Sequence, residues 1–122
     1  MKKVFVTRKL LKENEEKLKE LFDVKLNSDD KIYSAAEIIE GSKNFDGILS
    51  SVTDPITCDT ISKLSSSIKI IANGAVGFGN IDIKAAKKKG ITVTNTPDVL
   101  TDATADIQIL LLLGASRKAY EG

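Results

Sequence analysis

The chain has 122 residues, 42% of them hydrophobic, which is enough for one core of ordinary size and too few for two independent domains. Eighteen basic residues nearly balance 17 acidic ones, so no net field favours nucleic acid or an anionic membrane as a partner. The single cysteine, Cys58, excludes an internal disulfide, and early charged residues do not match a signal peptide, so we expect a cytoplasmic protein.

Five short runs rich in β-branched residues are predicted as strands, and segments of helical periodicity separate them. The predicted strands are residues 3–7, 23–27, 46–50, 68–73 and 91–95. Strands that alternate with helices indicate a parallel sheet with helices on both faces. The sequence therefore predicts one α/β domain over residues 1–100.

The segments between these strands predict four helices. The first is amphipathic, with an apolar stripe formed by Leu11, Leu18, Leu21 and Phe22. The other three are predicted at residues 34–42, 56–64 and 82–89. Asp82 at the start of the last of these, and Gly90 just after its end, are residue types that favour helix termini.

Residues 101–122 are predicted to form one long helix, with Thr101 or Asp102 as its N-cap. Its apolar residues, concentrated between positions 107 and 113, point in nearly every direction around the axis. This run is far shorter than the roughly 18 residues that indicate a membrane span. A helix that is apolar on all sides needs partners on all sides, so we expect residues 101–118 to pack against a second domain or a partner chain.

The loop after the fourth predicted strand, "NGAVGFGNID", resembles a nucleotide-binding loop. Its glycines at 74, 77 and 79 have relative positions 0, 3 and 5, whereas the dinucleotide fingerprint needs 0, 2 and 5. Loops at the carboxyl edge of a parallel sheet commonly bind ligands, and successive backbone N–H groups can hold an anion there. Two interpretations stay open: a small-anion site at Ala75, Val76 and Gly77, or a glycine-rich turn needed only for backbone geometry.

A longer match begins at this loop. Residues 70–118, "IIANGAVGFGNIDIKAAKKKGITVTNTPDVLTDATADIQILLLLGASRK", closely resemble the D-isomer-specific 2-hydroxyacid dehydrogenases, and within them the glyoxylate and hydroxypyruvate reductase branch. Residues 1–69 match more loosely, with "DGILSSVTDPI" in the place of the first substrate loop. The resemblance implies a flavodoxin-like substrate domain and, from residue 101, an interdomain helix that leads into a Rossmann domain binding NAD or NADP.

Residue by residue, the resemblance implies that the amides of Val76 and Gly77 hold the carboxylate of a small 2-oxo or 2-hydroxy acid. It also implies that Thr104 lies beside the nicotinamide end of the cofactor. From the residue alone, Thr104 is equally well explained as a hydroxyl that satisfies local backbone groups near a helix start. Asn95 and Pro97 resemble the hinge and turn residues of the family.

The chain departs from the family pattern in several places. Gly79 stands where the family usually has aspartate, which removes an anchoring acceptor and leaves the backbone freer. Ser50 and Ser51 replace the basic residue of members that act on phosphorylated substrates, which favours a small unphosphorylated acid. The family's GxGxxG motif and its catalytic arginine, glutamate and histidine have no counterpart among these residues, and Arg117 matches a structural arginine. No catalytic residue is assigned.

Other reactive residue types have simpler explanations. Cys58 has no histidine to act as its base, since the chain contains none, and is interpreted as a small packing residue. Asp102 and Asp106 fit the first turns of a helix, so no metal site is predicted. The lysines at 87–89 are interpreted as solvated surface near a helix C-terminus.

The leading hypothesis is the N-terminal portion of an NAD(P)-dependent D-2-hydroxyacid dehydrogenase that reduces glyoxylate or hydroxypyruvate. We expect it to be truncated or completed by a partner chain, inactive alone, and unable to bind the cofactor tightly by itself. Two alternatives stay open: a non-enzymatic module that binds a small carboxylate or pairs through its last helix, and a non-functional remnant.

Overall fold

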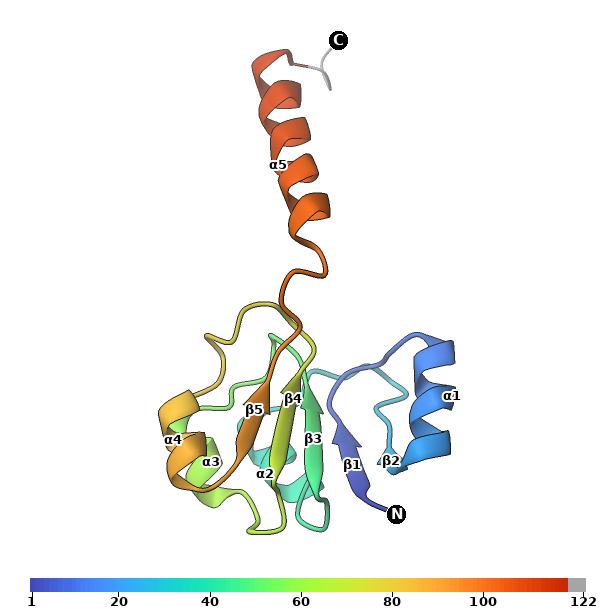
Figure 1. Cartoon of the computed structure of the whole chain (residues 1–122), viewed down its shortest axis with the longest axis vertical. Coiled ribbons are helices and arrows are strands. Elements are labelled where there is room, and N and C mark those ends of the chain that lie inside the picture. Colours follow the sequence, from blue (N-terminus) through green and yellow to red (C-terminus); the bar gives the residue numbers. More distant parts are fainter. Residues whose placement is uncertain (119–122) are drawn as a thin grey trace.

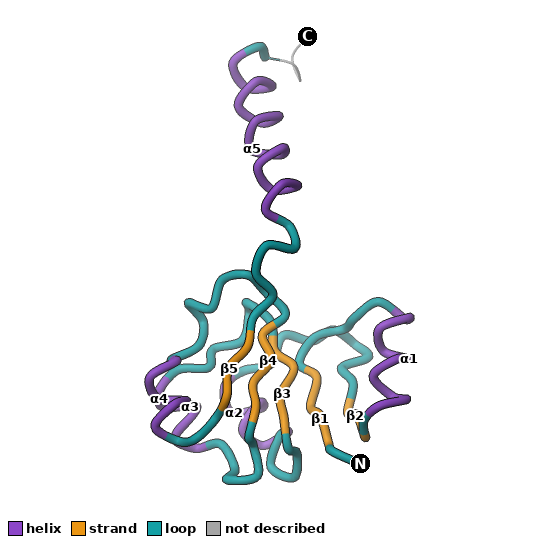
Figure 2. The backbone as a smooth tube through the Cα atoms, viewed as in Figure 1, coloured by secondary structure: helices purple, strands orange, loops and turns teal. Residues whose placement is uncertain are grey.

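The computed structural model describes residues 1–118 and contains a five-stranded parallel sheet (Figures 1 and 2). The strands are β1 (Lys3–Val6), β2 (Asp23–Lys25), β3 (Gly47–Ser50), β4 (Ile70–Asn73) and β5 (Thr92–Thr94). Their order across the sheet, β2-β1-β3-β4-β5, is that of flavodoxin-like domains. The predicted fold class and all five strands are confirmed, and each strand is shorter than its predicted range.

Three helices cover one face of the sheet: α2 (Ala35–Gly41), α3 (Cys58–Lys63) and α4 (Ile83–Lys88). On this face Phe5, Ile48 and Ile71 lie opposite one another in neighbouring strands, and each is almost completely buried. They form one core with the buried helix side chains, which include Ile38, Ile61 and Ala86. The main hydrophobic core therefore lies between the sheet and these three helices.

The opposite face is covered only in part, by α1 (Lys12–Leu21). Of the predicted apolar stripe, Leu18 and Phe22 are half-buried, whereas Leu11 and Leu21 are 74% and 60% exposed. Beside α1 an apolar groove of about 410 Å³ runs over the strands. We call four of its sheet residues the open sheet face: Val4, Leu49, Ile70 and Ala72.

The helix termini confirm one predicted cap and correct another. The Asp82 carboxylate accepts a hydrogen bond from the Ala85 N–H at 2.9 Å and caps α4, as predicted. Gly90, with a φ of 75°, follows that helix in the left-handed conformation that glycine adopts without strain. The prediction of Thr101 or Asp102 as the cap of the last helix is wrong, because the N-cap is Leu100, whose side chain makes no capping bond.

The last helix, α5 (Thr101–Ser116), projects away from the domain (Figure 1). None of its residues is buried, and Ile107 through Leu113 are exposed on all sides, so the sheet domain does not cover even the one face of this helix that a domain of its size could cover. The predicted segment 101–122 extends to residues 119–122, which lie outside the described residues. Among the described residues, no helix combines the length and apolarity needed to cross a membrane.

Candidate functional site

Two loops meet at the carboxyl edge of the sheet, one after β3 and one after β4. The Asp54 side chain, in the first loop, is completely buried, and its Oδ2 accepts hydrogen bonds from the Thr7 hydroxyl and the Ser51 N–H. The Asn80 side chain, in the second loop, donates to the carbonyl oxygens of Ser51 and Asp54 at 3.0 and 3.1 Å. Polar side chains therefore join the two loops into one unit.

Asn73, the last residue of β4, is buried beneath the second loop and hydrogen-bonds to it. It is 2% exposed, and its amide oxygen accepts a hydrogen bond from the Ser50 hydroxyl at 3.0 Å. Its Nδ2 donates to the Gly77 carbonyl at 3.0 Å and to Asn80 Oδ1 at 3.3 Å. Sequence reasoning did not identify Asn73 or Asn80, although two amide residues bracketing a glycine loop at a strand end were a signal for such anchors.

The segment after β5 also donates hydrogen bonds to the same loop. The Thr96 N–H donates to the Ala75 carbonyl at 3.0 Å, and Asn95 Nδ2 donates to the Val76 carbonyl at 2.9 Å. Together with the bond from Asn73, these contacts engage three successive carbonyl groups. The backbone of residues 75–77 is therefore fixed by its oxygen atoms.

The N–H groups of residues 75–77 in this loop remain unused. Within residues 1–118, no acceptor is hydrogen-bonded to the N–H of Ala75, Val76 or Gly77. Ala75 and Val76 are half-buried and Gly77 is exposed, so the loop lies at the surface of the domain. A run of free, fixed N–H groups is the arrangement that binds an anion through the backbone.

Two glycines of this loop, Gly77 and Gly79, are not required by close packing, whereas a Cβ at Gly74 would lie 3.4 Å from the Ser50 carbonyl oxygen. Gly74, Gly77 and Gly79 have no left-handed φ, and a Cβ added to Gly77 or Gly79 would meet no atom within 4 Å. Neither glycine is thus required by a left-handed backbone or by a neighbouring atom, and the anion-site and plain-turn interpretations both stay open. The Gly79 position has no anchoring side chain, as expected, but the bonds from Asn73 and Asn95 fix the loop on either side.

A small cavity of about 240 Å³ opens at the same edge, next to Gly74. Its lining comes from the ends of β1, β3 and β4: Val6, Arg8, Lys9, Leu10, Leu49, Ser50, Ser51 and Gly74. The Arg8 guanidinium forms a two-point ion pair with Asp30, at 2.8 and 3.0 Å, and donates to Thr53. The Arg8 hydrogen bonds, helped by the Lys9 N–H, lower the pKa of Asp30 to about 2. Arg8 is therefore held in place, and the cavity is small, polar at its rim and open to solvent.

Thr104 lies apart from this loop, in the first turns of α5. It is exposed, its N–H makes the helical bond to Leu100, and its hydroxyl forms no hydrogen bond with the described residues. The structure thus brings Ala75, Val76 and Gly77 together and leaves Thr104 on the projecting helix. The alternative in which the Thr104 hydroxyl satisfies local backbone groups is not seen.

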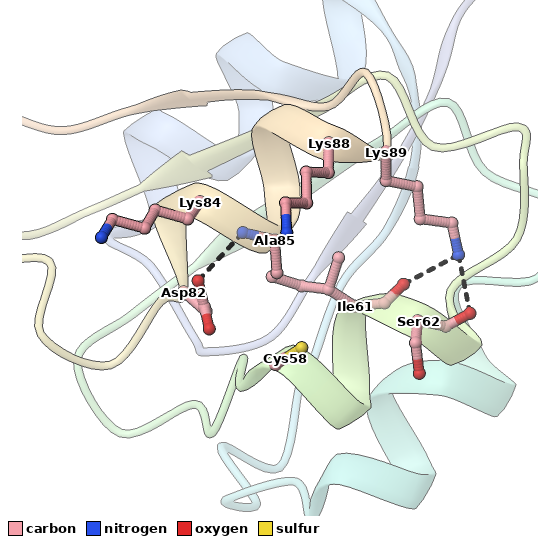
Figure 3. Close-up of a pocket in the computed structure, with 8 residues that line it drawn as sticks. All are labelled: Cys58, Ile61, Ser62, Asp82, Lys84, Ala85, Lys88 and Lys89. Atoms are coloured by element: carbon pink, nitrogen blue, oxygen red, sulfur yellow. Dashed lines mark hydrogen bonds between the residues drawn. The ribbon is translucent and has the colours of Figure 1, made fainter.

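A larger cavity, of about 590 Å³, lies between α3 and α4 (Figure 3). Cys58 lines it and is exposed, so its interpretation as a packing residue is wrong. The Lys89 ammonium donates to the carbonyls of Ile61 and Ser62 at 2.8 and 2.9 Å and so stabilises the end of α3, rather than being simple solvated surface. Lys89 and Asp82 are engaged by the fold, whereas Lys84 and Lys88, which also line this cavity, form no hydrogen bond or ion pair with the described residues.

Comparisons with known proteins match almost the whole chain. The family model for the catalytic domain of D-isomer specific 2-hydroxyacid dehydrogenases matches residues 4–121. A glyoxylate reductase of Korarchaeum cryptofilum is 42% identical over 119 residues, which is 98% of this chain and 36% of the relative. A glycerate dehydrogenase of Hyphomicrobium methylovorum is 36% identical over 121 residues, 99% of this chain and 38% of the relative.

Solved structures agree with these matches. The glyoxylate reductase of Paecilomyes thermophila has a TM-score of 0.81 and 27% identity, covering 98% of this chain and 39% of that protein. The TT0316 protein of Thermus thermophilus has a TM-score of 0.87 and 34% identity, covering 98% of this chain and 38% of that protein. The chain thus spans somewhat more than a third of the length of the relatives that it matches.

Proposed function

The chain belongs to the family of D-isomer specific 2-hydroxyacid dehydrogenases, and from this premise we propose that it binds the substrate of an NAD(P)-dependent reductase of small 2-oxo acids. Glyoxylate and hydroxypyruvate are the proposed substrates. The proposed boundary separates a substrate domain over residues 1–100 from an interdomain helix that starts at residue 101. The matched glyoxylate reductases and the glycerate dehydrogenase support this choice of chemistry.

The free N–H groups of Val76 and Gly77 are the observation on which this proposal rests. A carboxylate accepts two parallel hydrogen bonds, and charge-assisted bonds of this kind are about twice as strong as neutral ones. A cavity of about 240 Å³ lies next to Gly74 at the same edge of the sheet; residues 75–77 do not line it, but its size, below the roughly 300–1,000 Å³ of pockets for drug-sized ligands, is compatible with an acid of few atoms nearby. Arg8 and Lys9 line it together with Ser50 and Ser51, so its charge suits an anion, and the choice of an unphosphorylated acid rests on the family resemblance at the two serines.

This chain's role in the reaction is orientation. When the two N–H groups hold the carboxylate, the neighbouring C2 carbonyl is fixed at the edge of the sheet, and such positioning lowers the barrier of the chemical step. A nicotinamide cofactor, when bound, supplies the hydride that reaches C2, while a proton reaches the carbonyl oxygen. Thr104 is the proposed contact of this chain with that cofactor, and its free, exposed hydroxyl fits the role.

The exposed apolar surface of α5 is proposed to pack against a cofactor-binding domain, on the same chain or on a partner. Six isoleucine and leucine side chains between Ile107 and Leu113 are 53–69% exposed. Such a patch marks an interaction site in a soluble domain. Because Thr104 lies on the same helix, docking of α5 would bring the cofactor contact and the carboxylate site into one cleft.

A titration of the ¹⁵N-labelled chain with glyoxylate tests the proposal. We expect the amide resonances of residues 75–78 to shift in a saturable way, while those of α3 and α4 stay in place. Glycolaldehyde, which lacks the carboxylate, and acetate, which lacks the oxo group, are matched control ligands. Equal shifts with acetate would support a general carboxylate-binding module instead, and no shift with either acid would refute the proposed site.

Turnover is tested separately by following NADH or NADPH oxidation with glyoxylate. We expect none from this chain alone and activity after a cofactor-binding domain that docks on α5 is supplied. Full activity of the chain alone would contradict the division of labour proposed here.

A further inference from the structure

The two hydrogen bonds from the segment after β5 reach the same peptide groups whose N–H groups form the candidate site. Asn95 Nδ2 donates to the Val76 carbonyl at 2.9 Å. The Thr96 N–H donates to the Ala75 carbonyl at 3.0 Å. The Asn95 side chain is half-buried and so has a restricted position.

Because peptide groups are planar, these contacts also set the direction of the N–H groups of Val76 and Gly77. The C=O of Val76 and the N–H of Gly77 belong to one rigid planar group and point in opposite directions. A bond that fixes the Val76 oxygen therefore also fixes where the Gly77 N–H points. In the same way, the bond from Thr96 to the Ala75 carbonyl fixes the Val76 N–H.

The bonds also strengthen the donors. A hydrogen bond accepted by a peptide carbonyl polarises that peptide, and its N–H becomes a better donor to a ligand. Asn95 supplies this effect with a neutral side chain, which adds no negative charge near the expected carboxylate. A carboxylate at position 95 could not donate to a carbonyl and would repel an anionic ligand.

We propose that Asn95 is a positioning residue, which aims the Gly77 N–H at the substrate carboxylate through its bond to the Val76 carbonyl. This inference rests on the proposed function of the loop. Asn95 does not touch the substrate; it acts through the peptide that does. Because Asn95 lies on the segment leading to Thr101, where α5 begins, the direction of the Gly77 donor is tied to the position of that helix.

The test compares N95L, which keeps the approximate shape but cannot donate, with N95Q, which keeps the amide donor. The control is N44L, the same change at an exposed asparagine between α2 and β3, at the opposite edge of the sheet. We expect N95L to weaken glyoxylate binding about three- to tenfold, the range of one neutral hydrogen bond. N95Q should recover most of the affinity, and N44L should bind as the wild type does.

A ligand-free measurement separates this inference from the function on which it rests. In N95L the amide proton of Gly77 should shift and its hydrogen exchange should change, with the melting temperature preserved. If N95L leaves both the Gly77 resonance and the glyoxylate affinity unchanged, the inference is overturned while the proposed function stands. If the wild type binds no glyoxylate, the proposed function fails, and the Gly77 resonance still decides whether Asn95 orients that peptide. Should N95L unfold, N95A provides the same comparison.

Discussion

Removal of residues 101–122 is expected to leave the stability of the sheet domain unchanged. No residue of α5 is buried, so the helix adds nothing to the core formed by α2, α3 and α4. The free energy of unfolding should therefore change by no more than about 0.5 kcal/mol, the usual range for surface changes. For a domain of about 100 residues, this corresponds to roughly 2–4 °C in melting temperature.

The same deletion should change self-association. The six exposed apolar side chains of α5 are Ile107, Ile109, Leu110, Leu111, Leu112 and Leu113. Full burial of one such side chain contributes about 2 kcal/mol, so three-fifths exposure leaves roughly 7 kcal/mol unrealised over the six. Association of two free chains costs about 4–15 kcal/mol, so α5 alone supports only weak pairing. A domain on the same chain avoids most of that cost.

Thermal melts and sedimentation over a range of concentrations check both expectations. The full chain should associate reversibly as its concentration rises, and the deletion variant should stay monomeric. A double substitution of Leu110 and Leu113 by Glu keeps the chain length and should have the same effect as the deletion. A fall in melting temperature of more than about 8 °C on deletion would show that α5 packs on the sheet domain, contrary to this reasoning.

Three other substitutions probe the ion pair, the core and the loop. Asp30 has a folded-state pKa of about 2 because Arg8 pairs with it, so it contributes stability above its ordinary pKa of 3.8, and this contribution is lost as pH falls toward 2. In D30N the free energy of unfolding should therefore depend less on pH between 3.8 and 2. A pH dependence parallel to that of the wild type would contradict this. Gly41→Ala should destabilise by about 1–3 kcal/mol in urea unfolding, because its Cβ would lie 2.6 Å from the buried Phe5 ring; an unchanged midpoint would show that the ring moves aside. Gly77→Ala should leave the free energy of unfolding in urea within about 0.5 kcal/mol, because its Cβ meets no atom of the chain. The substitution keeps the N–H but adds a methyl group beside it, so it should crowd a bound carboxylate and weaken glyoxylate binding in an NMR titration. Unchanged binding would argue against a ligand at this position.

The sequence predicted the strands well because β-branched residues favour extended backbone, even in β2 and β5, which contain no buried residue. It predicted Asp82 and Gly90 at the ends of α4 because caps are local, made between residues three or four apart. The start of α5 was harder to predict, because several residues near it favour a helix start. The residue at the N-cap, Leu100, makes no side-chain capping bond. Cys58 was misread because its neighbours predict a helix without revealing which side of it faces the core.

The candidate loop was located from its glycines, but its anchors were not. Asn95 and Val76 are 19 residues apart in sequence, and Asn80 and Ser51 are 29 apart. Such bonds depend on how loops from different strands meet, which local propensity does not encode. The family resemblance predicted that Val76 and Gly77 act through their amides; the structure adds that these N–H groups have no acceptor among residues 1–118, while the carbonyls of residues 75–77 are engaged by other residues.

Because of the open sheet face, the free energy of unfolding of this domain depends on whether its groove is covered. Val4, Leu49, Ile70 and Ala72 border an apolar groove that α1 covers only in part, with Ile70 41% exposed. Any segment that covers the groove binds the folded state and not the unfolded chain, so by mass action it raises the free energy of unfolding in step with its own concentration. The free energy of unfolding measured on this chain alone is therefore that of the domain with its groove exposed to water.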